Sequence, residues 1–287
     1  MFEPVAALWA IAASGLTSAL LVGAGRRAGL GDVWAFGPAV GLGCYIGLSI
    51  LGVRPRWPMR EDQDRFLGIV LPAILAAEAA VGILRRPSRP GFAARLLAAT
   101  AVALAILYGS SYLVDLDGPG SAEWPPIRRC LILGGLGLAT ACNWSALVWI
   151  QSRSRSAALI PLALATAVSG AGPAIMLSGY ASGGLIALPL ALALFGAIVA
   201  GAASGVGVGL VGLSGVLMMG AFYGRLGAVE AVVLFLAPSL AGVPETALRS
   251  RPNARFHAAL GFGLTACAVL AALVTAWRRF ASDVSGL

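Results

Sequence analysis

The longest uninterrupted apolar stretch constrains the fold of this chain most. It runs from Gly184 to Gly224 and consists almost entirely of apolar and small residues. A single α-helix of that length would extend about 60 Å, twice the ~30 Å thickness of the hydrocarbon core of a bilayer. The stretch therefore predicts two helices that fold back on each other. The pair Ser204-Gly205 is the favoured position for the turn between them.

The rest of the chain consists of apolar runs that each suit one membrane crossing. Only 11% of the residues are charged, whereas soluble proteins carry roughly a quarter. Together with the two helices of the long stretch, ten spans are predicted, and nine if the segment carrying Pro238 and Pro244 is re-entrant. We therefore expect an all-α, polytopic transmembrane helix bundle in a single integral membrane domain, residues 1–287. The other predicted spans are Pro4–Gly23, Val33–Gly52, Phe66–Leu84, Leu96–Val114, Cys130–Ile150, Ala157–Ser178, Ala228–Val243 and Phe256–Trp277.

The charges of the chain indicate a membrane surface rather than nucleic acid. All 20 basic residues are arginines, and the net charge is +8. They stand in small groups at the ends of apolar runs, where positive charge fixes topology and contacts lipid headgroups. We expect a lipid bilayer as partner and no nucleic acid. The arginine groups within 26–27, 85–95, 153–155 and 249–255 fall on one side, taken as the cytoplasmic side of a bacterial inner membrane, with both termini outside.

Glu78 is an acidic residue near the middle of a predicted span. A carboxylate at this depth is costly, so it is expected to face the bundle interior or a water-filled cavity, or to be protonated. Two interpretations stay open. Glu78 is either a coupling site for protons or cations, or a protonated carboxyl that hydrogen-bonds a neighbouring helix through the hydroxyls of residues 110–112. Glu230 and Glu245, near the ends of another span, are expected at the water interface.

Two polar turns are further candidates for a binding site. They cover residues 110–124 and 176–184, and counting the helices between them places both on the same face of the membrane. The alternative is that their Ser and Asp side chains only satisfy free backbone groups at helix ends. The candidate ligand-binding residues are therefore Glu78, Ser110, Ser111, Tyr112, Ser178, Tyr180 and Ser182.

Glycines recur at four-residue spacing in the long apolar stretch, at Gly201, Gly205 and Gly209. This spacing lets helices approach each other closely. We expect these glycines to pack helices together, either within the bundle or in a homo-oligomer or membrane complex. A phosphate-binding loop is excluded because the run is intramembrane and the chain has no lysine.

The sequence Gly212-Leu213-Ser214-Gly215 resembles the catalytic serine motif of rhomboid intramembrane proteases, whose partner histidine lies two helices later. His257 has that position in this chain. The resemblance fails elsewhere, because Ala139 stands where rhomboids carry a second histidine before the residue matching Asn143. The expected depths of Ser214 and His257 also differ by roughly 10 Å along parallel helices, too far for a nucleophile and its base.

The four cysteines lie in or beside apolar runs and lack metal-type spacing, so they are expected to pack as small apolar residues. His257 has no second histidine or acidic cluster near it. No metal site and no cofactor is therefore expected.

Two segments, SSYLVDLDGPGSAEW and MLSGYASGG, precede a glycine-rich penultimate hairpin. Together they resemble an uncharacterised family of multi-pass membrane proteins from GC-rich, planctomycete-like bacteria. The resemblance covers most of the chain loosely and implies no known activity.

Three functions are compatible with these patterns. Proline-bent helices around a buried carboxylate suit a small-molecule or ion carrier, which is the leading hypothesis. The alternative is a non-catalytic membrane scaffold or complex subunit, in which the glycines and short loops serve helix association. A rhomboid-like serine protease ranks third, so the sequence favours no enzymatic activity.

Overall fold

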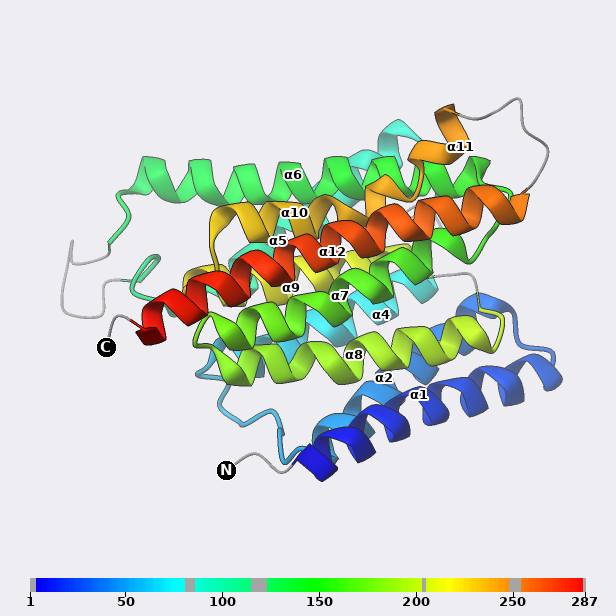
Figure 1. The fold of residues 1–287 in the computed structure, drawn as a ribbon, viewed down its shortest axis with the longest axis horizontal. Helices are drawn as coiled ribbons and strands as arrows, with labels where there is room; N and C mark the ends of the chain where they lie inside the picture. The colour runs from blue at the N-terminus through cyan, green and yellow to red at the C-terminus, as the bar shows by residue number, and fades with distance from the viewer. Residues whose placement is uncertain (1–3, 81–85, 115–122, 203–204, 248–253, 286–287) are drawn as a thin grey trace.

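The computed structural model describes residues 4–80, 86–114, 123–202, 205–247 and 254–285 (Figure 1). Within these ranges the regular structure is entirely helical, which confirms the all-α prediction. The helices lie roughly side by side as a bundle (Figure 1). In chain order they are α1 (Pro4–Arg27), α2 (Asp32–Ile50), α3 (Asp62–Arg65), the π-helix η1 (Phe66–Val70), α4 (Leu71–Ala80), α5 (Arg89–Leu107), α6 (Pro126–Arg153), α7 (Leu159–Leu177), α8 (Ala181–Val199), α9 (Val206–Phe222), α10 (Ala228–Leu240), α11 (Val243–Ala247) and α12 (Ala254–Ser285).

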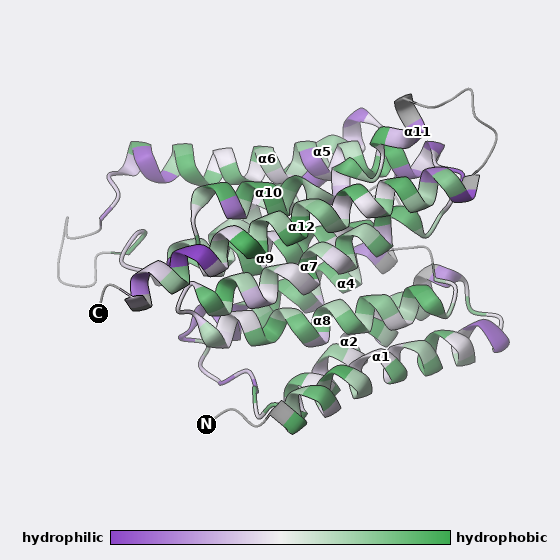
Figure 2. Ribbon diagram, viewed as in Figure 1, coloured by the Kyte–Doolittle hydropathy of each residue, from purple (hydrophilic) through white to green (hydrophobic). Residues whose placement is uncertain are grey.

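Seven helices of the described chain are long and apolar enough to cross a membrane. They involve α1, α5, α6, α7, α8, the α10–α11 segment and α12. Two more apolar helices, in α2 and α9, are shorter. Figure 2 shows hydrophobic residues along the middle of the bundle, with hydrophilic residues gathered mostly toward its two ends. These features indicate a multi-pass membrane protein.

The long apolar stretch folds back as expected. Its two halves are α8 and α9, and Gly205 caps the start of α9 with φ of 110°. Only glycine adopts this backbone conformation readily. The ring of Phe36 also lies where a Cβ on Gly205 would stand. Ser204, the other residue of the predicted turn, lies outside the described residues.

Several helix boundaries differ from the sequence prediction. Helix α5 begins at Arg89, so Arg95 lies inside a helix and not in a loop. Helix α12 continues past Trp277 to Ser285. The predicted span ended at Trp277 because charged residues follow it, but charged residues do not end a helix. The predicted span Phe66–Leu84 starts earlier, at α3, and passes through the π-helical turn η1 before α4.

Helix α9 is the centre of the bundle. Its residues from Val206 to Gly220 are all buried, and it contacts α4, α5, α6, α7, α8 and α10. Its glycines make this enclosure possible, because each stands where a side chain from a neighbouring helix would collide with a Cβ. Gly209 faces Leu164 of α7, and Gly212 faces Leu190 of α8.

The α1–α2–α8 corner is also held by small residues. A Cβ on Gly43 or Gly47 of α2 would meet Ser18 or Ser14 of α1, respectively. The Ser18 hydroxyl donates a hydrogen bond to the carbonyl of Ala39 across the helix pair, at 2.8 Å. Close backbone approach of this kind is the usual way in which helices associate in lipid.

The bundle has two ends, which are named here by one residue each. The Tyr180 end contains the start of α3, the α7–α8 turn, the α9–α10 turn and the last turns of α12. The Glu78 end contains the close of α4, the start of α9 and the α6–α7 turn. Helix α1 begins and helix α12 ends at the Tyr180 end (Figure 1), so the predicted placement of both termini on one side agrees with the fold.

Candidate functional site

Two turns touch each other at the Tyr180 end. The backbone N–H of Arg225, in the α9–α10 turn, donates to the carbonyl oxygen of Ser178, in the α7–α8 turn, at 3.0 Å. A Cβ on Gly224 would lie 2.8 Å from the Ser178 hydroxyl oxygen. The contact therefore depends on glycine, which leaves room for the neighbouring turn.

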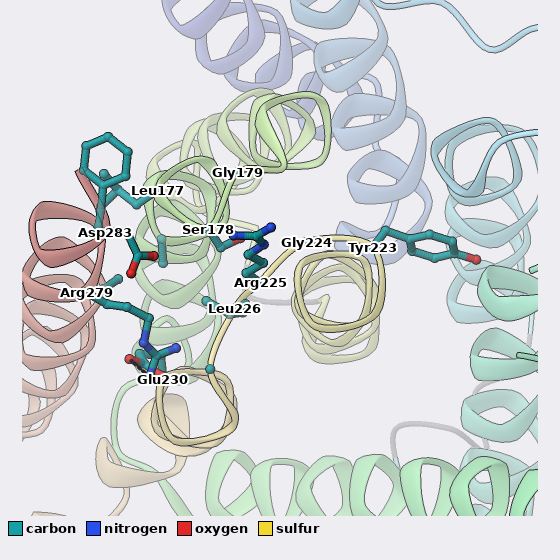
Figure 3. Close-up of a pocket in the computed structure, with 14 residues that line it drawn as sticks. Leu177, Ser178, Gly179, Tyr223, Gly224, Arg225, Leu226, Glu230, Arg279 and Asp283 are labelled. Carbon is teal, nitrogen blue, oxygen red and sulfur yellow. Dashed lines mark ion pairs between the residues drawn. The ribbon is translucent and has the colours of Figure 1, made fainter. Parts of the chain in front are cut away.

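A cavity of about 530 Å³ opens between these turns and the last part of α12. This volume lies within the range of about 300–1,000 Å³ that is usual for small-molecule sites. Figure 3 shows the side chains of Arg225, Arg279 and Asp283 turned toward the space, while the ring of Tyr223 points away from it. The remaining walls are mostly apolar or glycine. The polar side chains of the lining are Ser178, Arg225, Glu230, Arg279 and Asp283.

The buried acid of this cavity is Glu230, in the first turn of α10, with a side chain that is 3% exposed. Its Oε1 lies 3.0 Å from Nη2 of Arg279 on α12, whose side chain is 48% exposed. The other carboxylate oxygen, Oε2, is buried and has no hydrogen-bond partner in the described part of the chain. Glu230 stands at an end of its helix, as the sequence predicts, but its side chain is buried and not solvated, because α12 extends far enough to cover it.

A buried hydrogen-bonded cluster lies at the same end. The Tyr180 hydroxyl is 2.8 Å from both carboxylate oxygens of Asp62 and donates its proton to them. The Tyr180 ring stacks on Tyr223, whose hydroxyl donates to the carbonyl of Ile106 at 3.0 Å. The guanidinium of Arg65 donates to the same carbonyl at 3.2 Å. The cluster thus joins α3, α5, α8 and the close of α9.

Burial shifts the titration of this cluster. Removal from water raises the pKa of the Asp62 carboxyl, although the hydrogen bond from Tyr180 and the charge of Arg65 oppose the shift. Burial also raises the pKa of the Tyr180 and Tyr223 phenols, and the nearby charge of Asp62 adds to both shifts. Both tyrosines are therefore hydrogen-bond donors at neutral pH.

The turn at residues 110–112 reaches the Tyr180 end, as helix counting predicts, but its hydroxyls are engaged within the chain. Ser110 donates to the carbonyl of Leu107 at 2.6 Å. Ser111 donates to the carboxylate of Glu123, which precedes α6. The Tyr112 hydroxyl donates to the carbonyl of Phe222 at 3.0 Å. These contacts favour the interpretation in which the turn satisfies helix ends.

The turn at residues 176–184 has two roles. Ser178 donates to the carbonyl of Ile175 at 2.7 Å, which closes α7, and it also lines the cavity. Tyr180 belongs to the Asp62 cluster, and Ser182 hydrogen-bonds the Tyr180 side chain. Of the predicted site residues, Ser178 is thus the one that the lining of this cavity includes.

Glu78 lies at the opposite end of the bundle and acts as a helix cap. Its Oε1 accepts a hydrogen bond of 2.6 Å from the backbone N–H of Gly207, in the first turn of α9. A carboxylate in this position satisfies a free N–H and complements the helix dipole. A Cβ on Gly207 would collide with both Glu78 and the ring of the fully buried Trp144. The predicted hydrogen bond from residues 110–112 to Glu78 is therefore wrong, because these groups lie at opposite ends.

The serine and histidine of the rhomboid-like motif do not form a catalytic pair. The hydroxyl of Ser214 donates to the carbonyl of Val211, one turn earlier in α9, at 3.1 Å. His257 is 1% exposed, and neither of its ring nitrogens has a hydrogen-bond partner among the described residues. A nucleophile needs its base within hydrogen-bond reach. His257 stands in the first turn of α12, and its side chain is buried there.

Sequence reasoning missed the charged residues that lie inside the bundle. Arg95 is 1% exposed and donates to the Ser145 hydroxyl at 2.9 Å and to the carbonyl of Arg86 at 3.1 Å. Asp62, which is also buried, lies before the predicted span Phe66–Leu84, and Arg279, the partner of the buried Glu230, lies past the predicted span Phe256–Trp277. Their distance from the apolar runs could have indicated this. Each of these charges stands within a turn or two of an apolar run, so the helix of that run can extend to include it.

No protein-family model matches the chain, and neither a curated protein nor a solved structure matches it significantly. Among the described residues, no group of three or more His, Cys, Asp or Glu side chains is placed to hold a metal ion. The site must therefore be interpreted from its own geometry.

Proposed function

We propose that this protein is a multi-pass membrane carrier that takes up a small polar solute through the cavity at the Tyr180 end. The observation that carries the proposal is a ligand-sized cavity lined by charged side chains in a largely apolar bundle. Charged groups of this kind are costly inside a membrane protein and tend to mark the path of a substrate.

The difference between the two ends of α9 supports transport. At the Tyr180 end the cavity reaches the α9–α10 turn. At the Glu78 end the start of α9 packs tightly against Glu78, Trp144 and the ring of Phe36. Alternating access requires one side open while the other is closed. The described part of the chain therefore fits a carrier that is open at the Tyr180 end.

Broken helices give such a carrier places to move. The third span changes from α3 through the π-helical turn η1 into α4. Proline residues stand inside α7 at Pro173 and inside α10 at Pro238. Discontinuous helices are frequent around the substrate sites of carriers, because they combine free backbone groups with local flexibility.

A scaffold role, the alternative, has less support. The glycines predicted to serve association face the chain's own side chains: Arg26 beside Gly201, Phe36 beside Gly205 and Leu164 beside Gly209. Association through these three glycines stays a prediction. We place the carrier in the bacterial inner membrane, as the resemblance to multi-pass bacterial proteins suggests.

Solute efflux from proteoliposomes tests the proposal. Vesicles with and without the full-length protein are loaded with a defined mixture of amino acids, polyamines, organic acids and sugars, and the loss of each solute is followed by mass spectrometry. We expect at least one class to leave the protein-containing vesicles faster.

The matched control uses adjacent arginines. Arg279 lines the cavity and its neighbour Arg278 does not. The variant Arg279→Met should slow the efflux, and Arg278→Met should leave it unchanged. The carrier proposal fails if no solute leaves the protein-containing vesicles faster than the empty ones.

A further inference from the structure

The unpartnered oxygen of Glu230 is the strongest indication of what the cavity binds. A buried carboxylate oxygen without a donor costs free energy, commonly about 1–3 kcal/mol. Glu230 is 3% exposed, and its Oε2 has no partner among the described residues. Gly227 lies directly against this oxygen, and a Cβ there would collide with it. The same Cβ would also collide with the guanidinium of Arg279. The space next to Oε2 is therefore held by a glycine and by the Arg279 side chain, and a donor group from outside reaches this oxygen when Arg279 moves away.

Arg279 acts as an internal substitute for a cationic ligand. It pairs with Oε1 of Glu230 at 3.0 Å, yet 48% of its side chain is exposed. An arginine at the water interface can leave its partner at moderate cost, because its guanidinium is readily solvated there. An ammonium group that takes its place on Glu230 would leave the total charge of the pair unchanged. It would also free the guanidinium of Arg279 for an anionic group.

The rest of the lining fits a ligand that carries both charges. Arg225 and Asp283 also face the cavity and form no ion pair within the described residues (Figure 3). Counted with Glu230 and Arg279, the lining has two positive and two negative side chains. These four charges cancel, so a ligand with a net charge would leave one unbalanced charge in the cavity, whereas a ligand without a net charge would not. Leu177, Leu226 and Phe280 supply apolar walls, which suit an aliphatic or aromatic group.

We propose that the cavity binds a zwitterionic amino acid with an apolar side chain, which exchanges partners with the Glu230–Arg279 ion pair. The ammonium group of the ligand takes the carboxylate of Glu230, including Oε2. The carboxylate of the ligand takes Arg279 and Arg225. Transport of this ligand rests on the proposed carrier function, whereas its binding does not.

The exchange also gives binding a mechanical consequence. The Glu230–Arg279 pair joins α10 to α12. A ligand that separates the pair removes this direct link and replaces it with a bridge through itself. Binding can therefore change how α10 and α12 lie against each other, and a ligand shifts a conformational equilibrium only through such differences in contact.

Calorimetric titration with three related compounds tests the proposal on the full-length protein in lipid nanodiscs. The probes are L-leucine, leucinamide, which keeps only the ammonium group, and 4-methylpentanoate, which keeps only the carboxylate. The titrations are done at about pH 6, where amino groups are protonated and carboxyl groups are ionised. L-Leucine should bind saturably, and each single-charge analogue at least about tenfold more weakly, a change of one decade in Kd.

Four variants test the ammonium contact and the carboxylate contact of the ligand, and distinguish a loss of binding from a loss of folding. Glu230→Gln and Arg279→Met should abolish the preference for L-leucine, while Arg278→Met should bind L-leucine as the wild type does. If Glu230→Gln fails to fold, Arg225→Gln at the exposed mouth keeps the proposal testable. It should weaken binding of L-leucine several-fold and leave binding of leucinamide unchanged.

The proposal is overturned if L-leucine does not bind the folded wild-type protein. It is also overturned if 4-methylpentanoate binds as tightly as L-leucine, which would indicate an anion site. Efflux of sugars alone, without binding of L-leucine, would support the carrier function and contradict the proposed amino acid ligand. Binding of L-leucine without efflux of any solute would support the ligand and contradict the carrier function.

Discussion

The two ends of helix α9 use acidic residues in different ways. At the Glu78 end, the carboxylate is engaged by the N–H of Gly207 and packed beside Trp144, so it holds a helix in place. At the Tyr180 end, Glu230 has one oxygen paired with Arg279 and the other without a donor, next to a cavity of about 530 Å³. A carboxylate that is hydrogen-bonded to a helix end and closely packed has a structural role, whereas a carboxylate with an unpartnered oxygen beside a cavity indicates binding.

This difference shows that the position of an acidic residue within an apolar run does not predict its function. Glu78 stands near the middle of an apolar run and therefore suggested a coupling site. Glu230 stands near the edge of another run and suggested a solvated side chain. Each role depends on what the neighbouring helices place opposite the carboxylate, and that information is not local.

The largest effect is expected from filling the tight space at the Glu78 end. A valine at Gly207 would collide with Glu78 and Trp144. The variant Gly207→Val should lower the free energy of unfolding by about 3 kcal/mol, the upper part of the range for overpacked cores. Thermal melting in detergent measures the effect.

Gly134→Val in α6 is the control, because nothing lies within 4 Å of a Cβ at this exposed position. It should melt close to the wild type. Equal loss of stability in both variants would mean that the start of α9 is not tightly enclosed.

The next largest effect is expected at the other end of α9. Arg279→Met leaves the buried carboxylate of Glu230 without its cation. The loss should be about 2 kcal/mol, below the values for fully buried pairs, because Arg279 is half exposed. The double variant Glu230→Gln/Arg279→Met should recover part of the loss in the same melting assay. A single variant that melts like the wild type would show that the pair is not formed.

Removing the cap of α9 should have a smaller effect. Glu78→Ala leaves the N–H of Gly207 without the oxygen that accepts its hydrogen bond. We expect a loss of about 1 kcal/mol, as for other helix caps, and a smaller loss for Glu78→Gln, which keeps an acceptor oxygen. Unfolding in increasing denaturant measures both. If Glu78→Gln stops solute efflux at unchanged stability, Glu78 is a coupling site after all and the comparison of the two ends fails.

The smallest expected effect is a pH dependence from Asp62. Its pKa is raised in the folded state, chiefly by burial. The stability that its protonated form contributes is present below the ordinary pKa and is lost as the pH rises through the folded-state pKa. The melting temperature of the wild type should therefore fall more than that of Asp62→Asn between about pH 4 and about pH 7. Parallel curves for the two proteins would contradict the raised pKa.

The helices themselves were largely predictable from the sequence. The apolar runs located each long helix, and the length of residues 184–224 required a turn near Gly205, which the structure shows with a positive φ. The boundaries were less predictable, because helices continue into charged residues. Arg89 at the start of α5 and Ser285 at the end of α12 both lie beyond the apolar run.

The candidate site was only partly predictable. Ser178 was found because its turn is rich in glycine and hydroxyl groups, and it does line the cavity. Arg225, Glu230 and Arg279 were missed as site residues, because each is a charged residue at the edge of an apolar run, where charges are common. Their proximity results from packing between α7, α10 and α12, and contacts between helices far apart in the chain leave no periodic signal in one sequence.

The most direct test of the central claim compares Glu78→Gln and Glu230→Gln in one experiment. Both variants remove a buried negative charge and keep the size of the side chain. Titration with L-leucine should show binding to Glu78→Gln with the wild-type Kd and binding to Glu230→Gln that is at least about tenfold weaker, with both proteins folded by their melting curves. Loss of binding in Glu78→Gln together with normal binding in Glu230→Gln would contradict the roles assigned to the two ends of α9.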